Sequence, residues 1–351
     1  MKRVLYLTNT EVPYRVRFFN KLAEHCDLTV VYECRKSSSR DHSWARSQMK
    51  NFRTKYLRGI KFRGENVISL GILWEILGRY DIIVVGCYNS PSQMLAILAM
   101  RLLWIPYVLN LDGEIFLGEG GLKNRMKRFF LAGAQQYLSA GEKAGESIGK
   151  AVGEKTVIPY YFSSLSEDEV QEHSRTALQE NRNSTVLVVG QYFPYKGMDV
   201  ALEAARLDPS IPYKFVGMGP RTARFVTENE IPENVEIVPF MQKEELEREY
   251  RNCAMLVLPT RQECWGLVIN EAASFGTPIV STWGSGAAVE FLGERYPQYL
   301  ANPGDPDSLY DCICRCLSSA DQRAYCDYLI EKAKQYTIEN SIKAHLHVIE
   351  M

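Results

Sequence analysis

The sequence predicts an α/β fold with two Rossmann-like domains, and three observations lead to that prediction. The chain has 351 residues, which corresponds to about two domains of ordinary size. Short apolar runs alternate with amphipathic stretches, and most of these runs do not alternate between apolar and polar residues. Strands of that kind are typical of parallel sheets covered by helices on both faces. The same pattern starts again after a polar stretch at residues 163–184.

The first half contains six expected strands and four expected helices. The strands are expected at Val4–Leu7, Leu28–Tyr32, Ile82–Val85, Tyr107–Leu111, Tyr137–Ser139 and Thr156–Ile158. The helices are expected at Arg15–Glu24, Ser92–Trp104, Leu122–Ala134 and Glu142–Val152. These elements form a predicted first domain over residues 1–163.

The second half repeats this organisation with five expected strands and four expected helices. The strands are expected at Thr185–Val189, Tyr213–Val216, Val235–Val238, Met255–Leu258 and Pro278–Ser281. The helices are expected at Met198–Arg206, Arg221–Glu228, Lys243–Asn252 and Asn270–Phe275. They form a predicted second domain over residues 164–336, and a helix-rich tail over residues 307–351 closes the chain.

The composition is typical of a soluble globular protein, with 46% apolar and 24% charged residues. The net charge of −1 provides no overall attraction for nucleic acid or membrane. Nine cysteines, an odd number, and an N-terminus unlike a secretory signal indicate reduced thiols in the cytoplasm. The spacing of Cys312, Cys314 and Cys316 does not fit a zinc site. The most apolar stretch, residues 94–111, is interrupted by a charge and a proline, so we expect no membrane span.

One loop of the second half suits an anion. No dinucleotide fingerprint follows the first strand, and no P-loop motif occurs anywhere. The loop Gly190–Gly197 instead joins a strand to a helix, where backbone N–H groups and the helix dipole favour negative charge. Lys196 adds a positive charge there. The loop is therefore either a diphosphate site or an ordinary turn with a surface lysine.

A second segment carries two glutamates, Glu263 and Glu271, eight residues apart. Gly266 between them allows backbone amides to approach a ligand closely. Glu271 stands early in a helix, where an acidic residue can reach the hydroxyls of a ribose. On their own, the two glutamates also fit a helix-capping acid and a surface acid.

Taken together, these motifs resemble those of the family-four retaining glycosyltransferases. The resemblance covers about residues 186–317 and rests on the order and spacing of five motifs. They are G-x5-K-G at 190–197, V-G-x-G-P at 216–220, E-x7-E at 263–271, G-T-P-I-V at 276–280 followed by a small-residue loop and Glu290, and N-P-G-D-P at 302–306. More loosely, the opening P-Y-R-x-x-F-F-N-x-L at 13–22 resembles that of bacterial capsule and O-antigen sugar transferases.

The resemblance implies a GT-B fold, with a cleft between two domains and a nucleotide-sugar donor held by the second. Lys196, in one loop with Gly190 and Gln191, would contact the diphosphate. Glu263 would lie by the transferred sugar, and Glu271 would hold the ribose. Backbone amides of Trp265, Gly266 and Leu267 would lie near sugar and phosphate. The final helix, about residues 337–351, would pack back on the first domain.

The sequence departs from the family pattern at three places. Gln191 stands where the family usually has arginine, so Arg15 or Arg17 would have to supply that charge from the first domain. Cys264 and Trp265 follow Glu263 in place of glycine and phenylalanine. Asp112 takes the place of a histidine near the reacting carbon, although it also fits a simple Asp-Gly turn.

The five histidines bear on the mechanism, because none of them lies in a proposed site loop. An inverting transferase needs a general base for the acceptor hydroxyl, and only Asp112 would be available. A retaining transferase can pass that proton to the departing phosphate, so the sequence favours retention. We expect no cofactor and no metal, and we interpret Asp305-Pro306-Asp307 as the start of a helix.

A basic, aromatic-rich stretch lies at residues 35–64, with ten Lys or Arg against one acid, Asp41. A smaller cluster consists of Lys123, Arg125, Lys127 and Arg128. Basic residues beside aromatic ones suit an anionic membrane surface or an acceptor linked to lipid through pyrophosphate. A solvated loop is the alternative, and no nucleic acid is expected as a partner because no known binding module accompanies the stretch.

The predicted function is thus transfer of a hexose from a nucleotide-diphosphate sugar to a saccharide acceptor, in surface polysaccharide biosynthesis. The acceptor is expected to be lipid-linked and the protein to be cytoplasmic, at the inner face of the plasma membrane. Two alternatives remain open from the sequence. One is a nucleotide-sugar epimerase of the same fold, and the other is a non-catalytic relative that binds saccharides or partner proteins.

Overall fold

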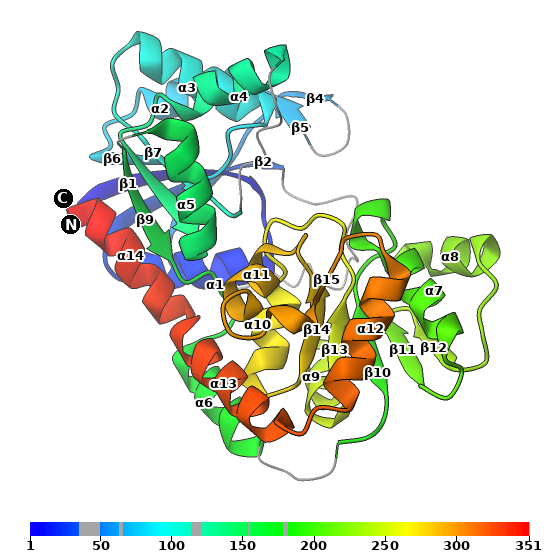
Figure 1. Ribbon diagram of the computed structural model, residues 1–351. Helices are drawn as coiled ribbons and strands as arrows, with labels where there is room; N and C mark the ends of the chain where they lie inside the picture. The colour runs from blue at the N-terminus through cyan, green and yellow to red at the C-terminus, as the bar shows by residue number, and fades with distance from the viewer. Residues whose placement is uncertain (35–49, 63–65, 114–120, 154, 178–181, 351) are drawn as a thin grey trace. The chain divides into compact units, whose positions relative to one another are not determined.

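The computed structural model describes residues 1–34, 50–62, 66–113, 121–153, 155–177 and 182–350. The chain forms two compact units, drawn from blue to red along the sequence in Figure 1. The first unit contains Met1–Ser164 and Ile338–Met351, and the second contains Leu165–Thr337. Much of the basic stretch, including Arg35, Lys36, Arg40, Arg46 and Arg63, lies outside the described residues.

A seven-stranded sheet with the order β3-β2-β1-β6-β7-β8-β9 forms the centre of the first unit, and all its pairings are parallel. Its strands are β1 (Arg3–Thr10), β2 (Asp27–Cys34), β3 (Arg53–Tyr56), β6 (Ile82–Val85), β7 (Val108–Leu111), β8 (Gln136–Ala140) and β9 (Thr156–Tyr160). Residues 4–7 of β1 are buried without alternation, as the sequence predicts for a sheet covered on both faces. The strand order reverses beside β1, which is where α/β sheets open a crevice at their carboxyl ends.

Six helices and a small hairpin complete the described part of the first unit. The helices are α1 (Pro13–Leu22), α2 (Gly71–Ile76), α3 (Pro91–Leu102), α4 (Leu122–Leu131), α5 (Gly141–Val152) and α14 (Ile338–Glu350). The antiparallel hairpin consists of β4 (Ile60–Phe62) and β5 (Asn66–Ile68). The last helix, α14, packs against α1 and β9, as the red helix in Figure 1 shows.

The second unit has a six-stranded parallel sheet with the order β12-β11-β10-β13-β14-β15. Its strands are β10 (Val186–Val189), β11 (Tyr213–Val216), β12 (Val235–Val238), β13 (Met255–Leu258), β14 (Ile279–Thr282) and β15 (Leu300–Ala301). Its helices are α6 (Glu167–Thr176), α7 (Met198–Leu207), α8 (Thr222–Glu228), α9 (Lys243–Asn252), α10 (Leu267–Ser274), α11 (Gly286–Leu292), α12 (Pro306–Leu317) and α13 (Gln322–Gln335). Short 3₁₀ turns lie at Pro194–Lys196, Gly219–Arg221 and Pro297–Tyr299.

Two helix starts follow directly from the local sequence. Ser166 and Glu169 form a capping box at α6, inside the polar stretch between the two halves. The carboxylate of Asp305 accepts a hydrogen bond from the Ser308 backbone N–H at 3.0 Å, and Pro306 opens α12. The interpretation of Asp305-Pro306-Asp307 as a helix start is therefore confirmed.

The predicted α/β fold with two mostly parallel sheets is confirmed, but six strands and helices were not predicted, namely β3, β4, β5, β15, α2 and α11. The small-residue loop expected after the G-T-P-I-V segment is short, because α11 already begins at Gly286. The edge strand β3 carries Arg53 and Lys55, and its four residues are exposed or half-buried, so it lacks the apolar signal of a buried strand. The hairpin β4–β5, the helix α2 and the two-residue strand β15 are too short for a periodicity to show. Among the described residues, no helix has the length and apolarity needed to cross a bilayer.

Candidate functional site

The loop after β10 is tied to the loop after β13 in the second unit. Pro194–Lys196 form a 3₁₀ turn, and the Tyr195 carbonyl accepts from the Thr260 hydroxyl at 2.8 Å and from the Arg261 N–H at 2.8 Å. Gly197 then adopts a φ of +68°, and a Cβ there would lie 1.9 Å from the Pro259 carbonyl oxygen. Only glycine fits both the left-handed backbone and this close approach. The two loops therefore hold Lys196 in one place.

Lys196 and Glu263, which are 67 residues apart, form an ion pair between these loops. The Lys196 ammonium donates to a carboxylate oxygen of Glu263, and the two side chains are 20% and 18% exposed. The pair is thus partly shielded from water, where electrostatic interactions are stronger than at an open surface. The fold brings together two residues that the sequence analysis selected from separate motifs.

The backbone around Glu263 is fixed by the loop after β14. The Glu263 N–H donates to the Gly284 carbonyl at 2.8 Å, and the Gly286 N–H donates to the Glu263 carbonyl at 3.2 Å. Gly266 has a φ of +109°, and Leu267 begins α10 directly after it. The first N–H groups of a helix have no acceptor inside the helix, so the turn at 265–267 offers donors to an anion.

The side chain of Trp265 belongs to the core, not to the surface of the loop. It is buried, and its indole N–H donates to the Asn270 side-chain oxygen at 2.8 Å. The Ser285 hydroxyl donates to the Trp265 carbonyl at 2.9 Å and fixes the same turn. A role for Trp265 in ligand binding is therefore limited to its backbone amide, as the sequence analysis assumed.

Glu271 lies in the second turn of α10, half-buried, beside a residue that the sequence analysis missed. The buried phenol of Tyr250 in α9 donates to a carboxylate oxygen of Glu271 at 3.1 Å. Burial and the Glu271 charge raise the pKa of Tyr250 well above its ordinary value, so the phenol stays protonated. Tyr250 thereby orients the carboxylate of Glu271.

A further cation contacts the β10–α7 loop, in which Gln191 stands where the family pattern would have arginine. Arg221 ends the turn Gly219–Arg221, and its guanidinium carbon lies 3.8 Å from the ring centroid of Phe193 in that loop. Such a contact holds a cation against an aromatic face. No local sequence pattern indicates this contact, because Arg221 and Phe193 lie in different βα loops.

In the first unit, polar side chains surround Asp112 after the end of β7. Arg15 of α1 donates to one carboxylate oxygen, and the Tyr160 phenol donates to the other at 2.7 Å. The Asn110 side-chain amide donates to Asp112 at 3.0 Å. His345 of α14 lies on the other side of Asn110, with Nε2 2.9 Å from the amide oxygen. The small cavity beside these groups has room for about one water molecule at most.

The protonation states in this cluster follow from burial and from the Asp112 charge. Burial opposes the charge of Arg15, but Asp112 and the neighbouring tyrosines together outweigh burial and raise the pKa of the guanidinium. Burial and Asp112 raise the pKa of Tyr160, which keeps its proton for donation. Burial lowers the pKa of His345 to about 4, so its ring is neutral at pH 7. Asp112 is thus a fixed, partly exposed acceptor of three hydrogen bonds.

This cluster adds a histidine to the surroundings of a predicted site residue. The sequence analysis placed no histidine in a site loop, and His345 is indeed outside every such loop, 235 residues from Asn110. Arg15 pairs with a carboxylate of its own unit, and its contact with a phosphate stays a prediction. Arg17 donates to the Ser164 carbonyl at 2.9 Å.

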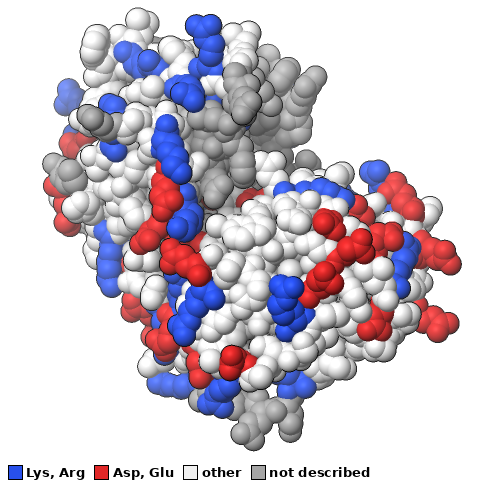
Figure 2. All heavy atoms as spheres, in the orientation of Figure 1, with Lys and Arg blue, Asp and Glu red and all other residues white. Residues whose placement is uncertain are grey.

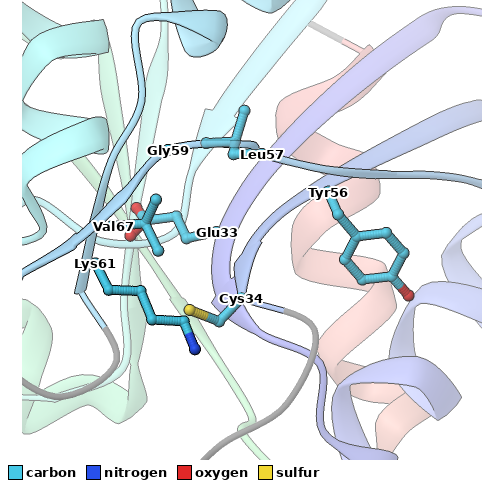
Figure 3. Close-up of a pocket in the computed structure, with 7 residues that line it drawn as sticks. All are labelled: Glu33, Cys34, Tyr56, Leu57, Gly59, Lys61 and Val67. Atoms are coloured by element: carbon cyan, nitrogen blue, oxygen red, sulfur yellow. The ribbon is translucent and has the colours of Figure 1, made fainter.

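A separate cavity of about 340 Å³ lies in the first unit, beside β2, β3 and the hairpin (Figure 3). Its lining includes Glu33, Cys34 and Lys61. Ser90 and Gln93 donate to the Glu33 carboxylate, the latter at 3.0 Å, and burial raises the pKa of Glu33. The described residues that line this cavity include none of the predicted site residues.

Comparison with known proteins identifies the second unit. Residues 170–336 match the family model "Glycosyl transferases group 1". The match covers just under half of the chain. An uncharacterized glycosyltransferase of Methanocaldococcus jannaschii is 23% identical over 244 residues, which are 67% of this chain and 65% of that relative. The aligned segment thus spans just under two thirds of the relative's length.

Two solved structures resemble the whole chain. Anabaena HepE in complex with UDP and glucose has a TM-score of 0.73 at 15% identity and covers 100% of both chains. WaaG, a glycosyltransferase involved in lipopolysaccharide biosynthesis, has a TM-score of 0.67 at 16% identity and covers 99% of both chains. The fold of this chain is therefore GT-B, and the matches support a transferase enzyme.

Proposed function

We propose that this chain is a retaining glycosyltransferase that moves a hexose from a nucleotide-diphosphate sugar to a saccharide acceptor. The observation that carries the proposal is the ion pair between Lys196 and Glu263, with Glu271 in the second turn of the following helix α10. The glycosyl transferases group 1 domain and the binding of UDP and glucose by HepE support a nucleotide-sugar donor.

The second unit offers separate groups to the parts of such a donor. Lys196 and the N-terminal amides of α10 suit the diphosphate, which carries negative charge. Glu271, oriented by Tyr250, suits the two ribose hydroxyls. Glu263 is held beside Lys196 and so would lie at the sugar end of the diphosphate. Gly190 and Gln191 border the same loop.

Retention follows if the acceptor hydroxyl attacks the anomeric carbon on the face from which the nucleoside diphosphate departs. The new carbon–oxygen bond forms as the old carbon–oxygen bond to the phosphate breaks, and the hydroxyl proton passes to the departing phosphate oxygen. Lys196 and the loop amides stabilise the charge that develops on that phosphate. No general base is then required, and Asp112 would orient the acceptor.

The acceptor and the setting are also part of the proposal. We infer a lipid-linked saccharide of a surface polysaccharide, handled at the inner face of the plasma membrane. The role of WaaG in lipopolysaccharide biosynthesis and the basic cluster at 123–128 support this reading. We further propose that transfer needs no metal, so that a chelator leaves the rate unchanged.

The experiment incubates the chain with UDP-, GDP-, ADP- and dTDP-hexoses and a lipid-linked saccharide, and follows product by mass spectrometry. Glu263→Gln should lower the rate about a hundredfold or more, because it removes a charge beside the reacting centre. Glu236→Gln is the matched control, since Glu236 is an exposed, ion-paired glutamate of the same unit, 3.4 Å from Lys214.

Three outcomes would contradict the proposal. Near-normal turnover by Glu263→Gln would remove the assigned role of this residue. Conversion of the donor sugar to its epimer without acceptor would identify an epimerase. Absence of turnover with every donor, together with tight saccharide binding, would identify a non-catalytic binding protein.

A further inference from the structure

The first unit has an exposed apolar face on three neighbouring helices. The face, here called the α2–α4 face, consists of Trp74 from α2, Leu102 and Trp104 at the end of α3, and Leu122, Met126 and Phe129 from α4. Their exposed fractions are 80%, 79%, 92%, 75%, 48% and 46%, respectively. The helix α3 packs against both α2 and α4, so the six side chains come from neighbouring helices. Soluble proteins rarely leave so many large apolar side chains together in water.

The apolar residues of α4 follow the helical period. Leu122, Met126 and Phe129 are separated by four and three residues, which aligns them on one side of the helix. Exposed Arg125 and Arg128 flank this stripe. The helix α4 is thus amphipathic, but this apolar stripe is exposed to solvent and is not packed into the core.

Arg101 joins α3 to α4 within this surface. Its guanidinium carbon lies 4.1 Å from the Phe129 ring centroid, and the guanidinium donates to the Phe129 carbonyl. The contact fixes a cation against an exposed aromatic ring. Apolar and cationic groups are therefore interleaved on the α2–α4 face.

Trp104 occupies a backbone position that favours glycine. It has a φ of +56°, the only positive value among the described non-glycine residues, and the following Ile105 N–H donates to the Met100 carbonyl at 2.8 Å. Such helix ends usually carry glycine, because a bulky residue is strained there. The Trp104 side chain is 92% exposed, so packing inside the fold does little to offset this strain.

The charges of this region select the kind of partner. The three helices contain five Lys or Arg and one acid, Glu75, which pairs with Lys55 at 2.7 Å. In Figure 2, blue spheres lie among white ones over the region of α3 and α4. The whole first unit has 25 Lys and Arg against 16 Asp and Glu, whereas the second has 16 against 26. Protein interfaces are depleted of charge at their centres, but a bilayer surface favours apolar and cationic residues side by side.

We propose that the α2–α4 face lies on an anionic lipid bilayer, with Trp74 and Trp104 at the level of the headgroups. Tryptophan is enriched at that depth because its ring is apolar and its N–H is polar. Leu102, Leu122 and Phe129 enter the boundary of the acyl chains, and Arg125 and Arg128 meet the anionic headgroups. The biological purpose of this contact rests on the proposed function, since binding to the bilayer would bring the enzyme to a lipid-linked acceptor.

The test measures co-sedimentation of the full chain with vesicles of phosphatidylcholine alone and with about one quarter phosphatidylglycerol. We expect binding to the anionic vesicles, weaker binding to the zwitterionic ones, and loss of binding as salt is raised. The key variant is Trp104→Gly. It suits the positive φ, so it should keep or raise the thermal midpoint while it weakens vesicle binding about tenfold.

A charge variant and two controls complete the design. Arg125→Glu with Arg128→Glu should also weaken binding to anionic vesicles at least about tenfold, since each basic residue near the surface contributes separately. Leu207→Ser and Arg323→Glu alter exposed residues of the second unit and should leave binding unchanged. All variants should keep the wild-type rate of transfer to a soluble acceptor.

The inference is overturned if the chain does not bind anionic vesicles, or if both face variants bind as the wild type does. It is also overturned if the chain is a dimer that Trp104→Gly dissociates without any vesicle binding, which would make the face a self-association interface. No donor is present in the test, so its result is independent of the proposed function. Vesicle binding without transferase activity would support the membrane-binding face and refute the assignment as an enzyme.

Discussion

The two units share one architecture but differ in where their informative residues lie. Both are parallel sheets covered by helices, and in both the inner strands of the sheet are buried. Fifteen of the twenty exposed large hydrophobic side chains among the described residues are in the first unit, which has excess basic charge. The second unit has excess acidic charge but carries Lys196, Glu263 and Glu271. Burial thus decides the common fold, and exposed groups decide what each unit binds.

The difference has a consequence for the donor. A nucleotide diphosphate is an anion, yet we place it on the unit whose overall charge is negative. The overall field therefore opposes binding, and attraction must come from a few fixed groups, namely Lys196 and the amides at the start of α10. Loss of one such group should therefore weaken binding of the donor strongly.

The largest expected effect is that of Lys196→Ala on the second unit. We expect transfer to fall about a hundredfold to a thousandfold, as when a single preorganised donor is removed elsewhere. The thermal shift produced by UDP or the preferred nucleotide should fall with it. For the wild type, ligand at a hundred times its dissociation constant should add about 2.7 kcal/mol. Differential scanning fluorimetry and initial rates measure both effects.

The matched change in the first unit is Asp112→Asn, which should lower the rate but leave the nucleotide-induced thermal shift intact. Lys243→Ala, an exposed and ion-paired lysine of α9, controls for loss of charge in the second unit. If Asp112→Asn abolished the shift and Lys196→Ala did not, the assignment of donor and acceptor sides would be reversed.

Next in size is the effect of removing one hydrogen-bonded arginine from each unit, the buried Arg15 or the half-buried Arg182. Arg15 has a carboxylate partner, Asp112, and Arg15→Met should destabilise the first unit by about 3–5 kcal/mol because it leaves that charge unpaired. Arg182 in the second unit donates to carbonyl oxygens, among them Phe275 at 2.8 Å and Arg251 at 2.9 Å. Arg182→Met leaves uncharged acceptors, so we expect a loss of about 1–3 kcal/mol.

Hydrogen exchange in urea separates the two units, since peptides from β1–β7 and β10–β14 report on each. Combining Arg15→Met with Asp112→Asn should recover part of the lost stability, because the unpaired charge of Asp112 is then gone. Equal losses for the two arginine variants, with no recovery in the double variant, would mean that the charge of Asp112 does not matter for folding.

A smaller effect concerns one buried histidine in each unit. Burial lowers the pKa of His345 in the first unit and of His173 in the second to about 4. The unfolded chain binds the proton with a pKa near 6.5, so stability falls as the pH drops from about 6.5 to 4. At pH 5 each histidine should lower the free energy of unfolding by about 2 kcal/mol relative to pH 7.5.

Urea unfolding at pH 7.5 and pH 5 tests this prediction. His345→Asn should reduce the acid sensitivity of the first unit alone, and His173→Asn that of the second alone. The measured quantity is the difference in the free energy of unfolding between the two pH values. A loss of stability that is equal at both pH values therefore does not affect it. If neither variant changed the acid sensitivity, the two rings would be protonated in the folded state.

The sequence predicted most of the fold because buried parallel strands leave a continuous apolar signal. The bounds of Ile82–Val85, Tyr213–Val216, Met255–Leu258 and Lys243–Asn252 agree with the structure residue for residue. Where the pattern is weak, prediction failed. Strand β3 pairs with β2 through its backbone while its side chains stay outside the core, so composition could not show it.

The candidate site of the second unit was accessible to sequence analysis because its residues lie in short motifs with a fixed order. Glu263, Gly266 and Glu271 share one strand–turn–helix segment, and local backbone geometry requires glycine at 266. Tyr250, Arg221 and His345 were not found. Tyr250 contacts the site residue Glu271, whereas Arg221 and His345 contact Phe193 and Asn110, which lie close in sequence to Gln191 and Asp112. Each contact joins different elements of the chain, and no local pattern records it.

By itself, the sequence determined the alternation of strands and helices, the glycine-bearing loops and the order of the site motifs, because these depend on local backbone preferences and burial. Only the tertiary structure decided that Lys196 meets Glu263, that Asp112 meets Arg15 and Tyr160, and that the apolar stripe of α4 faces outward. The reason is physical: contacts between distant residues and the exposure of a helix face depend on how elements pack, which the spacing of residues along the chain does not fix.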